Sequence, residues 1–316
     1  MSRYYQTGQE ERYEIYAFRK AGISQKEIAK SLNRDPSSIS RELKRNAGKR
    51  SYRPKQAHEK ASSRRFSATR IDVEVIEFVK KKIRDEWSPE QISGWLKKHS
   101  GRTVSHEWIY QYVWKNKASG GLLFRNLRHA QKKKKKRYGS NDKRGQIKNR
   151  VSIDERPKIV EKKSRIGDWE IDTVIGKNHK GGLVTIVDRK SKLTLIAQVD
   201  RKQSILVKEA TLMLLNPLKS ISHTITADNG KEFASHEDVA SSLKLSYFFA
   251  HPYSSWERGL NENTNGLIRQ YFPKGTNFQK VTQMEVEKVA EKLNNRPRKT
   301  LNYKTPKEVF NLKLTG

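Results

Sequence analysis

The 316-residue sequence contains no cysteine. This absence excludes disulfide bonds and zinc sites built on cysteine ligands, so packing alone must hold the fold. Long apolar runs are also missing. No segment approaches the length that crosses a bilayer, and the first residues lack the apolar stretch of a signal peptide. We therefore expect a cytoplasmic protein with no membrane partner.

Negative charge is scarce relative to positive charge. The chain has 34 acidic residues against 67 Lys and Arg, a formal net charge of +33, yet 34% of its residues are hydrophobic. This apolar content is enough for packed cores, and the length predicts two or three domains. Such a surplus attracts polyanions, most commonly nucleic acid, although a ribosomal or membrane-surface protein would show the same surplus.

Residues 10–46 show the pattern of a helix-turn-helix, and we place a DNA-binding domain at residues 1–50. Apolar residues recur at helical spacing up to Gly22, which stops the first helix. Ser24 and Glu27 form a capping box that opens a second helix, and an Asp-Pro pair at 35–36 opens a third.

The third helix exposes short hydrogen-bonding groups near its start and cations further along. With this arrangement a recognition helix reads base edges and grips phosphates. A plain three-helix bundle with a solvated basic face would show the same charges. The side chains that we predict to bind DNA are Ser37, Ser38, Ser40, Arg41, Lys44 and Arg45.

A second helical domain, resembling another helix-turn-helix, is predicted at residues 71–130, after a basic, Ser-rich linker at 51–70. Helix caps at Ser88 and Ser105 support two of its helices. On its last helix, only two polar side chains stand out as candidates for reading the edges of DNA bases. This domain could therefore equally serve dimer contacts or core packing.

Residues 131–150 form a basic tether with no apolar period and a block of like charge. Such blocks stay solvated. An inert linker or a run that resembles a nuclear-localisation signal would have the same composition. Because a nucleic-acid partner is already indicated, we favour a phosphate-binding tether. The side chains expected to contact DNA are Lys132, Lys133 and Lys134.

From residue 151 strand and helix signals alternate, which defines a third domain at 151–316. Three consecutive strand patterns lie at 168–175, 183–188 and 193–199, and strand and helix patterns then alternate up to a helix that begins near Asn261. This order predicts an α/β domain with a mixed sheet. It is the order of the RNase H-like fold, but other α/β sheets share it.

Three carboxylates stand at the ends of elements in this domain. Asp172 is on the first strand, Asp228 follows the fourth, and Glu262 is in the first turn of the helix. In an RNase H-like sheet the first and fourth strands are neighbours, so Glu262 would complete a cluster with the two aspartates. Clustered carboxylates repel unless cations lie between them, and oxygen-only ligands favour Mg²⁺ or Mn²⁺. A two-metal phosphodiester site is the economical explanation.

Taken singly, each carboxylate has another explanation. Asp228 could cap a turn, Asp172 could lie on one face of an edge strand, and Glu262 could be favoured by the charge of a helix N-terminus. Their joint placement favours the metal site. Arg269 lies two turns beyond Glu262 on the same helix face, with Asn265 between them. We predict that Arg269 holds a DNA phosphate.

Several segments resemble the insertion-sequence-30 family of bacterial DDE transposases, which belongs to the retroviral-integrase superfamily. The resemblance covers nearly the whole chain, and the 33 residues between Asp228 and Glu262 are the interval that the family uses. One departure is Ile171, where a small residue such as Gly is expected. The matching segments are GISQKEIAKSLNRDPSSISRELKRN, WSPEQISGWL, VSHEWIYQYV, GDWEIDTVIGK, TADNGKEF, HPYSSWERGLNENTNGLIRQYFPKGT and LNNRPRKTLNYKTPKEVF.

The resemblance implies that Asp172, Asp228 and Glu262 are a catalytic triad that holds two Mg²⁺ ions, with Mn²⁺ as a substitute. It also implies cleavage and strand transfer on double-stranded DNA, at terminal inverted repeats and target DNA, by a homo-oligomer in the bacterial nucleoid. The absence of a GxxxxGK[ST] loop agrees with chemistry that hydrolyses no nucleotide. Two alternatives remain: a helix-turn-helix repressor with an idle catalytic domain, and a structure-specific nuclease.

Overall fold

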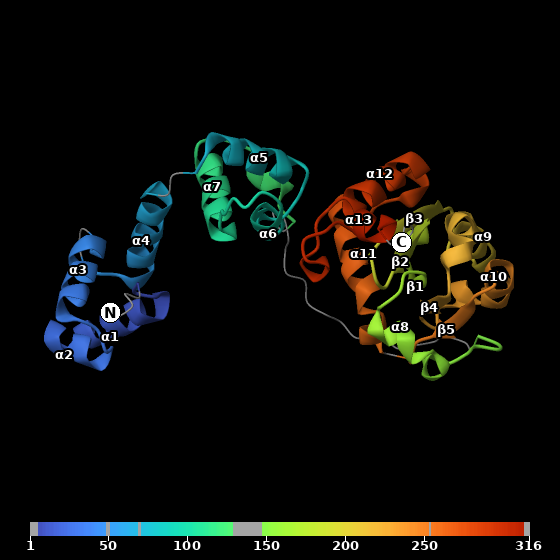
Figure 1. The fold of residues 1–316 in the computed structure, drawn as a ribbon, viewed down its shortest axis with the longest axis horizontal. Helices are drawn as coiled ribbons and strands as arrows, with labels where there is room; N and C mark the ends of the chain where they lie inside the picture. The colour runs from blue at the N-terminus through green and yellow to red at the C-terminus, as the bar shows by residue number, and fades with distance from the viewer. Residues whose placement is uncertain (1–5, 49–50, 69–70, 129–146, 253, 313–316) are drawn as a thin grey trace. The chain divides into compact units, whose positions relative to one another are not determined.

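The computed structural model describes residues 6–48, 51–68, 71–128, 147–252 and 254–312 (Figure 1). The chain divides into two compact units, one of residues 1–80 and 104–121 and the other of residues 81–103 and 122–316. Within the described ranges, no helix combines the length and the apolar character that a membrane span needs. The domain boundaries expected from the sequence remain predictions.

Three short helices form the predicted helix-turn-helix: α1 (Gln9–Lys20), α2 (Gln25–Ser31) and α3 (Pro36–Asn46). Gly22 follows α1 with a φ of 78°, a backbone conformation that glycine adopts without strain. At the start of α2, the Ser24 hydroxyl accepts from the Glu27 N–H, and the Glu27 carboxylate accepts from the Ser24 N–H. Asp35 caps α3 by accepting from the Ser37 N–H at 2.8 Å. The predicted caps are confirmed.

Residues 54–68 form a helix, α4 (Pro54–Ala68), where the sequence predicted part of a linker. This helix contacts α1 and α3. Tyr52 and Ala57 are buried in the same hydrophobic core as Ile28 and Leu43. Because α4 contributes few apolar side chains to this core, its sequence shows no helical stripe, and for this reason the sequence did not predict a helix there.

Helices α5 (Val73–Arg84), α6 (Pro89–His99) and α7 (His106–Ala118) follow. The Ser88 hydroxyl accepts from the Gln91 N–H at 3.2 Å, and the Gln91 side chain accepts from the Ser88 N–H at 2.8 Å. Ser105 caps α7 by accepting from the Trp108 N–H at 3.1 Å. These two caps agree with the sequence, whereas contact of these helices with DNA stays a prediction.

A five-stranded sheet with the order β3-β2-β1-β4-β5 organises the C-terminal half of the described chain. The pairs β1 with β2 and β2 with β3 are antiparallel, whereas β4 runs parallel to β1 and β5. This is the mixed topology of the RNase H-like fold, as expected. Because β1 is a central strand, the edge-strand explanation for Asp172 is excluded. The strands are β1 (Asp168–Ile175), β2 (Gly182–Asp188), β3 (Thr194–Val199), β4 (Thr224–Ala227) and β5 (Ser246–Phe249).

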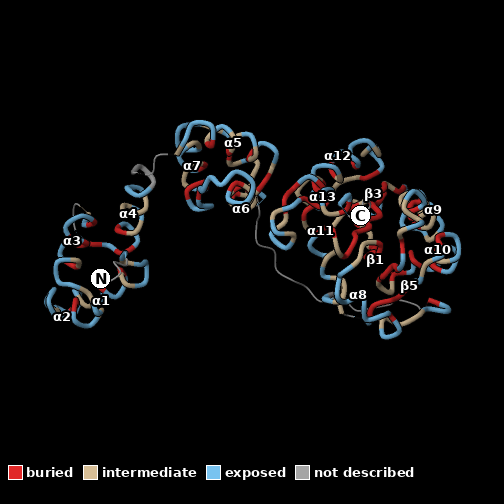
Figure 2. The backbone as a smooth tube through the Cα atoms, viewed as in Figure 1, coloured by how far each residue is buried: buried red, intermediate tan, exposed pale blue. Residues whose placement is uncertain are grey.

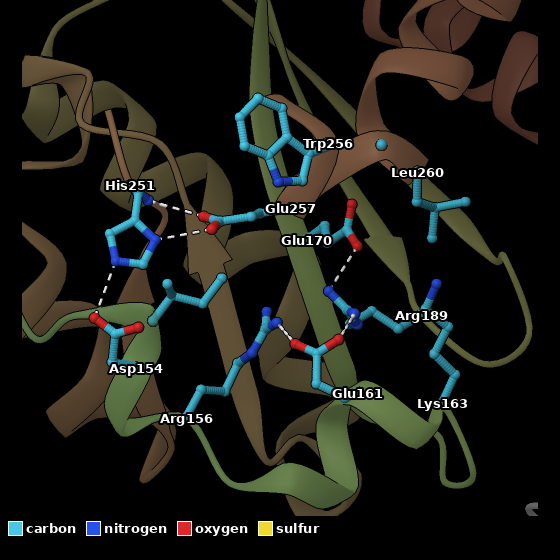
Figure 3. Close-up of a pocket in the computed structure, with 12 residues that line it drawn as sticks. Asp154, Arg156, Glu161, Lys163, Glu170, Arg189, His251, Trp256, Glu257 and Leu260 are labelled. Atoms are coloured by element: carbon cyan, nitrogen blue, oxygen red, sulfur yellow. Dashed lines mark hydrogen bonds and ion pairs between the residues drawn. The ribbon is translucent and has the colours of Figure 1, made fainter. Parts of the chain in front are cut away.

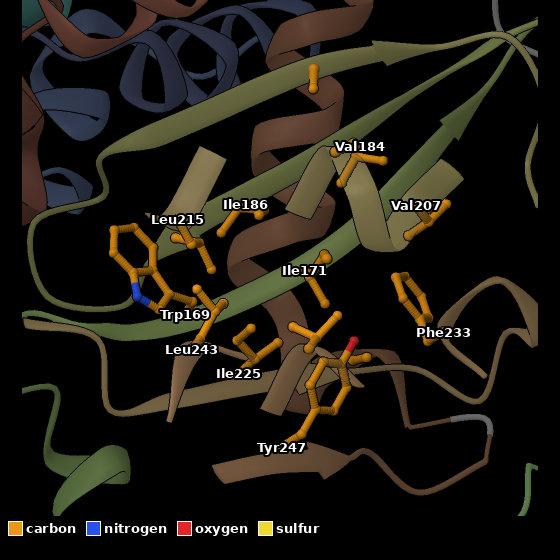
Figure 4. Packing of buried hydrophobic residues seen from close by; sticks show 14 of the residues in the cluster. Trp169, Ile171, Val184, Ile186, Val207, Leu215, Ile225, Phe233, Leu243 and Tyr247 are labelled. Carbon is orange, nitrogen blue, oxygen red and sulfur yellow. The ribbon is translucent and has the colours of Figure 1, made fainter. Parts of the chain in front are cut away.

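Helices cover both faces of the sheet, and the buried segments follow its strands (Figure 2). Trp169 and Ile171 point into a core formed with α9 and α10 (Figure 4). Val174 and Leu183 belong to the opposite core, formed with α11 and α12. Since side chains alternate along a strand, Ile171 packs behind Asp172. The helices are α8 (Lys158–Lys162), α9 (Ser204–Leu215), α10 (His236–Leu243), α11 (Gly259–Tyr271), α12 (Gln283–Asn294) and α13 (Pro306–Asn311).

Candidate active site

Asp172 lies on β1, and Asp228 directly follows the neighbouring strand β4. The parallel register aligns Glu170 of β1 with Thr226 of β4, so two further residues along each chain lead to Asp172 and to Asp228. The two carboxylates therefore come to the same place on the sheet, as the sequence predicts. The Gly230 N–H donates to Asp228 Oδ1 at 2.9 Å and thereby fixes the turn after β4.

Arg258 connects the two aspartates. Its Nη2 atom lies 3.2 Å from Asp228 Oδ2, and its Nη1 atom lies 3.7 Å from Asp172 Oδ1. Nη1 also donates to the carbonyl of Ile171 at 3.2 Å. Arg258 ends the short 3₁₀ turn that leads into α11, where the sequence has no periodic pattern that could show the direction of a side chain. Two carboxylates on different strands thus share one cation.

Asn265 holds the other carboxylate oxygen of Asp172. Its Nδ2 donates to Asp172 Oδ2 at 2.8 Å, and its Oδ1 accepts from the Thr185 hydroxyl at 3.1 Å. Thr185 of β2 lies directly opposite Asp172 in the strand register. Asn265 therefore fixes α11 over the two central strands that carry the site.

The electrostatics around Asp172 favour a positive partner. Burial raises the pKa of Asp172 above its ordinary value, Arg258 opposes this increase, and the Asp228 charge adds to it. A carboxylate whose ionised form is destabilised by burial gains more from a nearby cation than an exposed one. The site therefore needs positive charge to keep Asp172 ionised.

Glu262 is in the first turn of α11, one turn before Asn265 and on the same helix face, and its side chain is exposed. Within the described ranges, no group of three or more His, Asp or Glu side chains is arranged to hold a metal ion. The structure thus brings the two aspartates together but does not bring Glu262 to them. The metal-binding role of Glu262 stays a prediction.

The guanidinium of Arg269 contacts backbone carbonyls. Nη2 donates to the carbonyl of Ile175 at 2.7 Å, and Nη1 donates to that of Phe272 at 3.4 Å. Burial lowers the pKa of Arg269. In this structure Arg269 ties α11 to the end of β1, and its predicted contact with a DNA phosphate stays a prediction.

The predicted reading face of α3 is turned toward solvent. The opposite face is buried, and there Glu42 pairs with the buried Arg12 at 2.7 Å. Lys132, Lys133 and Lys134 of the tether lie outside the described residues. Among the predicted side chains of α3, Ser38 is partly exposed, and the exposed ones are Ser37, Ser40, Arg41, Lys44 and Arg45.

A second polar cluster lies on the Asp172 face of β1. Glu170 accepts from Arg189 at 2.9 Å, and Glu161 pairs with both Arg189 and Arg156. Glu170 and both arginines are almost fully buried. Figure 3 shows the arginines on either side of Glu161, among the residues that line a pocket of about 450 Å³. The sequence did not predict this cluster, because its members come from separate elements.

Comparisons with known proteins found a matching family model and similar transposases. A family model described as a helix-turn-helix domain matches residues 8–46. The transposase for insertion sequence element IS4351 of Bacteroides fragilis is 46% identical over 96% of this chain and 94% of its own length. The transposase InsI for insertion sequence element IS30A of Escherichia coli (strain K12) is 39% identical over 95% of this chain and 82% of its own length.

Among solved structures, the catalytic core domain of BIV integrase is 18% identical, covers 47% of this chain and 96% of its own, and gives a TM-score of 0.37. The identity to the two transposases, extending over nearly the whole length, indicates a DNA-binding enzyme of the recombinase type. The chain belongs to the IS30 family of insertion-sequence transposases.

Proposed function

We propose that the chain cuts DNA at the terminal inverted repeats of its insertion sequence and joins the freed 3′ ends to target DNA. Asp172, Asp228 and Glu262 are the proposed catalytic triad. The observation that supports this most is the single cation that Asp172 and Asp228 share across two strands. Glu262 stands one helical turn from Asn265, which already contacts Asp172.

Two Mg²⁺ ions, with Mn²⁺ as a substitute, fit the chemistry of these donors. The three side chains offer carboxylate oxygens, the ligands that hard divalent cations prefer. A cation at Asp172 also relieves the cost of ionising a partly buried carboxyl group, a cost that agrees with the raised pKa of Asp172. When bound, such ions activate the attacking oxygen and stabilise the charge that develops on the phosphate.

The chain's own residues prepare this site. Arg258 pairs with both aspartates, and Asn265 orients Asp172. Restraints of this kind reduce the reorganisation that the reaction would otherwise require. Arg258 and divalent ions would compete for the same carboxylate oxygens, so in the presence of such ions the guanidinium of Arg258 would be free to contact a DNA phosphate.

Recognition and chemistry are assigned to different parts of the chain. The N-terminal helical domains read the terminal repeat through α3, residues 131–150 grip phosphates without regard to sequence, and residues 151–316 carry out the chemistry. Because joining requires two element ends to be held together, we propose that a homo-oligomer assembles on double-stranded DNA at the bacterial nucleoid.

Incubation of the full-length chain with duplexes carrying candidate terminal repeats and Mg²⁺ tests the proposal, with cleavage and joining scored separately. We expect both products, and we expect neither after chelation of the metal. Cleavage without joining would identify a nuclease instead. Binding of the repeat without either product would identify a repressor.

A further inference from the structure

The pocket beside the active site is the most distinctive feature that the proposed chemistry leaves unused. Its volume of about 450 Å³ falls within the roughly 300–1,000 Å³ of pockets that hold small organic groups. Glu170 lines it, and Asp172 is two residues further along the same face of β1. The Asn261 N–H donates to Glu170 Oε2 at 3.2 Å, so the start of α11 adjoins both places.

The charges that line this pocket balance one another when His251 is protonated. Its acidic lining residues are Asp154, Glu161, Glu170 and Glu257, and its basic ones are Arg156, Lys163, Arg189 and His251. His251 stands between two of the carboxylates, at 2.8 Å from Glu257 and 2.9 Å from Asp154 (Figure 3). A balanced lining gives no net attraction for a phosphate. It suits an uncharged group that is rich in hydrogen-bonding atoms.

Unused hydrogen-bond donors point to the same kind of ligand. The Nε atoms of Arg156 and Arg189 are buried and have no hydrogen-bond partner within the described residues. Buried donors of this kind normally find an acceptor. The ring nitrogens and carbonyl oxygens of a nucleobase are acceptors of the required size and polarity.

Trp256 gives the pocket an aromatic wall. It belongs to the lining, yet 75% of its surface is exposed. Figure 3 shows its indole beyond Glu257 and Glu170, away from the two arginines. A large apolar ring kept in solvent at the mouth of a polar pocket has no role in the core. Bases of single-stranded nucleic acid stack on such rings.

We propose that this pocket receives the base of one nucleotide that flanks the scissile phosphate, extruded from the duplex and stacked on Trp256. The proposal rests on the proposed function, since it assumes that the scissile phosphate lies at Asp172 and Asp228. Glu170 and Asp172 are two strand residues apart, roughly 7 Å. One nucleotide of a DNA strand covers a comparable distance.

Binding of duplexes with a single mismatch tests this proposal without requiring cleavage. The mismatch is stepped pair by pair through the cleavage end of a terminal-repeat duplex, and the dissociation constant of the full-length chain is measured at fixed salt. A mismatched base costs less to extrude than a paired one. At one position beside the scissile phosphate we expect the mismatch to tighten binding by about tenfold.

Substitutions at Trp256 assign this gain to the pocket. Trp256→Ala should remove the gain, Trp256→Phe should keep most of it, and the control Ile205→Ala should keep all of it. Ile205 is 60% exposed and lies on α9, on the other face of the sheet. No gain at any position, an undiminished gain in Trp256→Ala, or a loss in the control would each overturn the proposal.

Cleavage assays on the same proteins separate this inference from the proposed function. A gain that depends on Trp256, in a chain that cuts no DNA, would support the pocket and refute the cleavage chemistry. Cleavage at the terminal repeat without such a gain would support the cleavage chemistry and refute the proposal for the pocket.

Discussion

Helix α3, the proposed recognition helix, and the β1 face beneath α11 use charge in opposite ways. On α3 the cations Arg41, Lys44 and Arg45 are exposed, and the one buried charge, Glu42, is paired with Arg12. On the sheet face, charged groups such as Glu170 and Arg189 are themselves buried and paired. On α3 the charged side chains extend into solvent, whereas on the β1 face they are fixed by buried partners.

This difference predicts two kinds of response to substitution. Exposed cations act over a distance, are screened by salt and contribute additively, so the loss of one weakens binding by a modest factor. Charges that share buried partners act through fixed geometry, so the loss of one disturbs the others. Substitutions in each region therefore test this difference.

The largest expected effect is at the proposed triad. Asp172→Ala, Asp228→Ala or Glu262→Ala should each reduce cleavage and joining about a thousandfold or more, equivalent to roughly 4 kcal/mol of barrier, because each removes metal ligands. Binding to the terminal repeat should stay nearly unchanged, since α3 is untouched. Single-turnover cleavage and gel-shift assays measure both quantities. Near-normal turnover of any variant would remove that residue from the triad.

The next effect concerns the buried pair behind α3. Arg12→Ala leaves the Glu42 carboxylate buried without the guanidinium that it now binds at 2.7 Å. We expect this loss to reduce the free energy of unfolding by about 3 kcal/mol. Arg19→Ala, an exposed cation of the same helix α1, is the matched control and should change it by less than about 0.5 kcal/mol. Denaturant titration monitored by circular dichroism compares the two, and equal stability would show that the pair contributes little.

A smaller effect is expected on the exposed side of α3. Arg41→Ala should weaken binding to the terminal repeat by about 1–3 kcal/mol and relax its preference at one or two positions, if this side chain contacts a base. Replacement of Lys132, Lys133 and Lys134 should weaken binding to all sequences and reduce its dependence on salt. Isotherms on repeat and scrambled duplexes at several salt concentrations distinguish these outcomes. If both changes reduced the affinity for repeat and scrambled duplexes equally, the sequence-reading side chains would lie elsewhere in the chain.

The same comparison explains which features the sequence could predict. The caps of α2 and α3 depend on residues within one turn, so Ser24 and Asp35 predicted them. The neighbouring position of Asp172 and Asp228 followed from the strand order of the RNase H-like fold, in which the first and fourth strands are adjacent. Neither helix caps nor strand order predicts where the Arg258 side chain points, because Arg258 follows an irregular loop. Charge pairs between separate elements, such as Glu170 with Arg189, leave no pattern in the sequence.

The smallest effect is expected at His251, whose side chain is exposed beside the pocket. Hydrogen bonds that His251 donates to Glu257 and, with a smaller effect, to Asp154 raise the pKa of His251 above its ordinary value of 6.5. A raised pKa means that the folded chain binds this proton more tightly than the unfolded chain does. The resulting stabilisation is therefore complete below a pH of about 6.5 and is lost as the pH rises through the folded-state pKa.

Limited proteolysis of the loop between β5 and α11 measures this dependence. We expect the wild-type loop to be cut more slowly at a pH near 6 than above the folded-state pKa, beyond the protease's own pH dependence. His251→Gln should remove this difference, because the glutamine amide can still donate a hydrogen bond but does not titrate. His179→Gln changes an exposed histidine elsewhere in the same domain and should leave it intact. A pH dependence that survives in His251→Gln would assign the titration to another group.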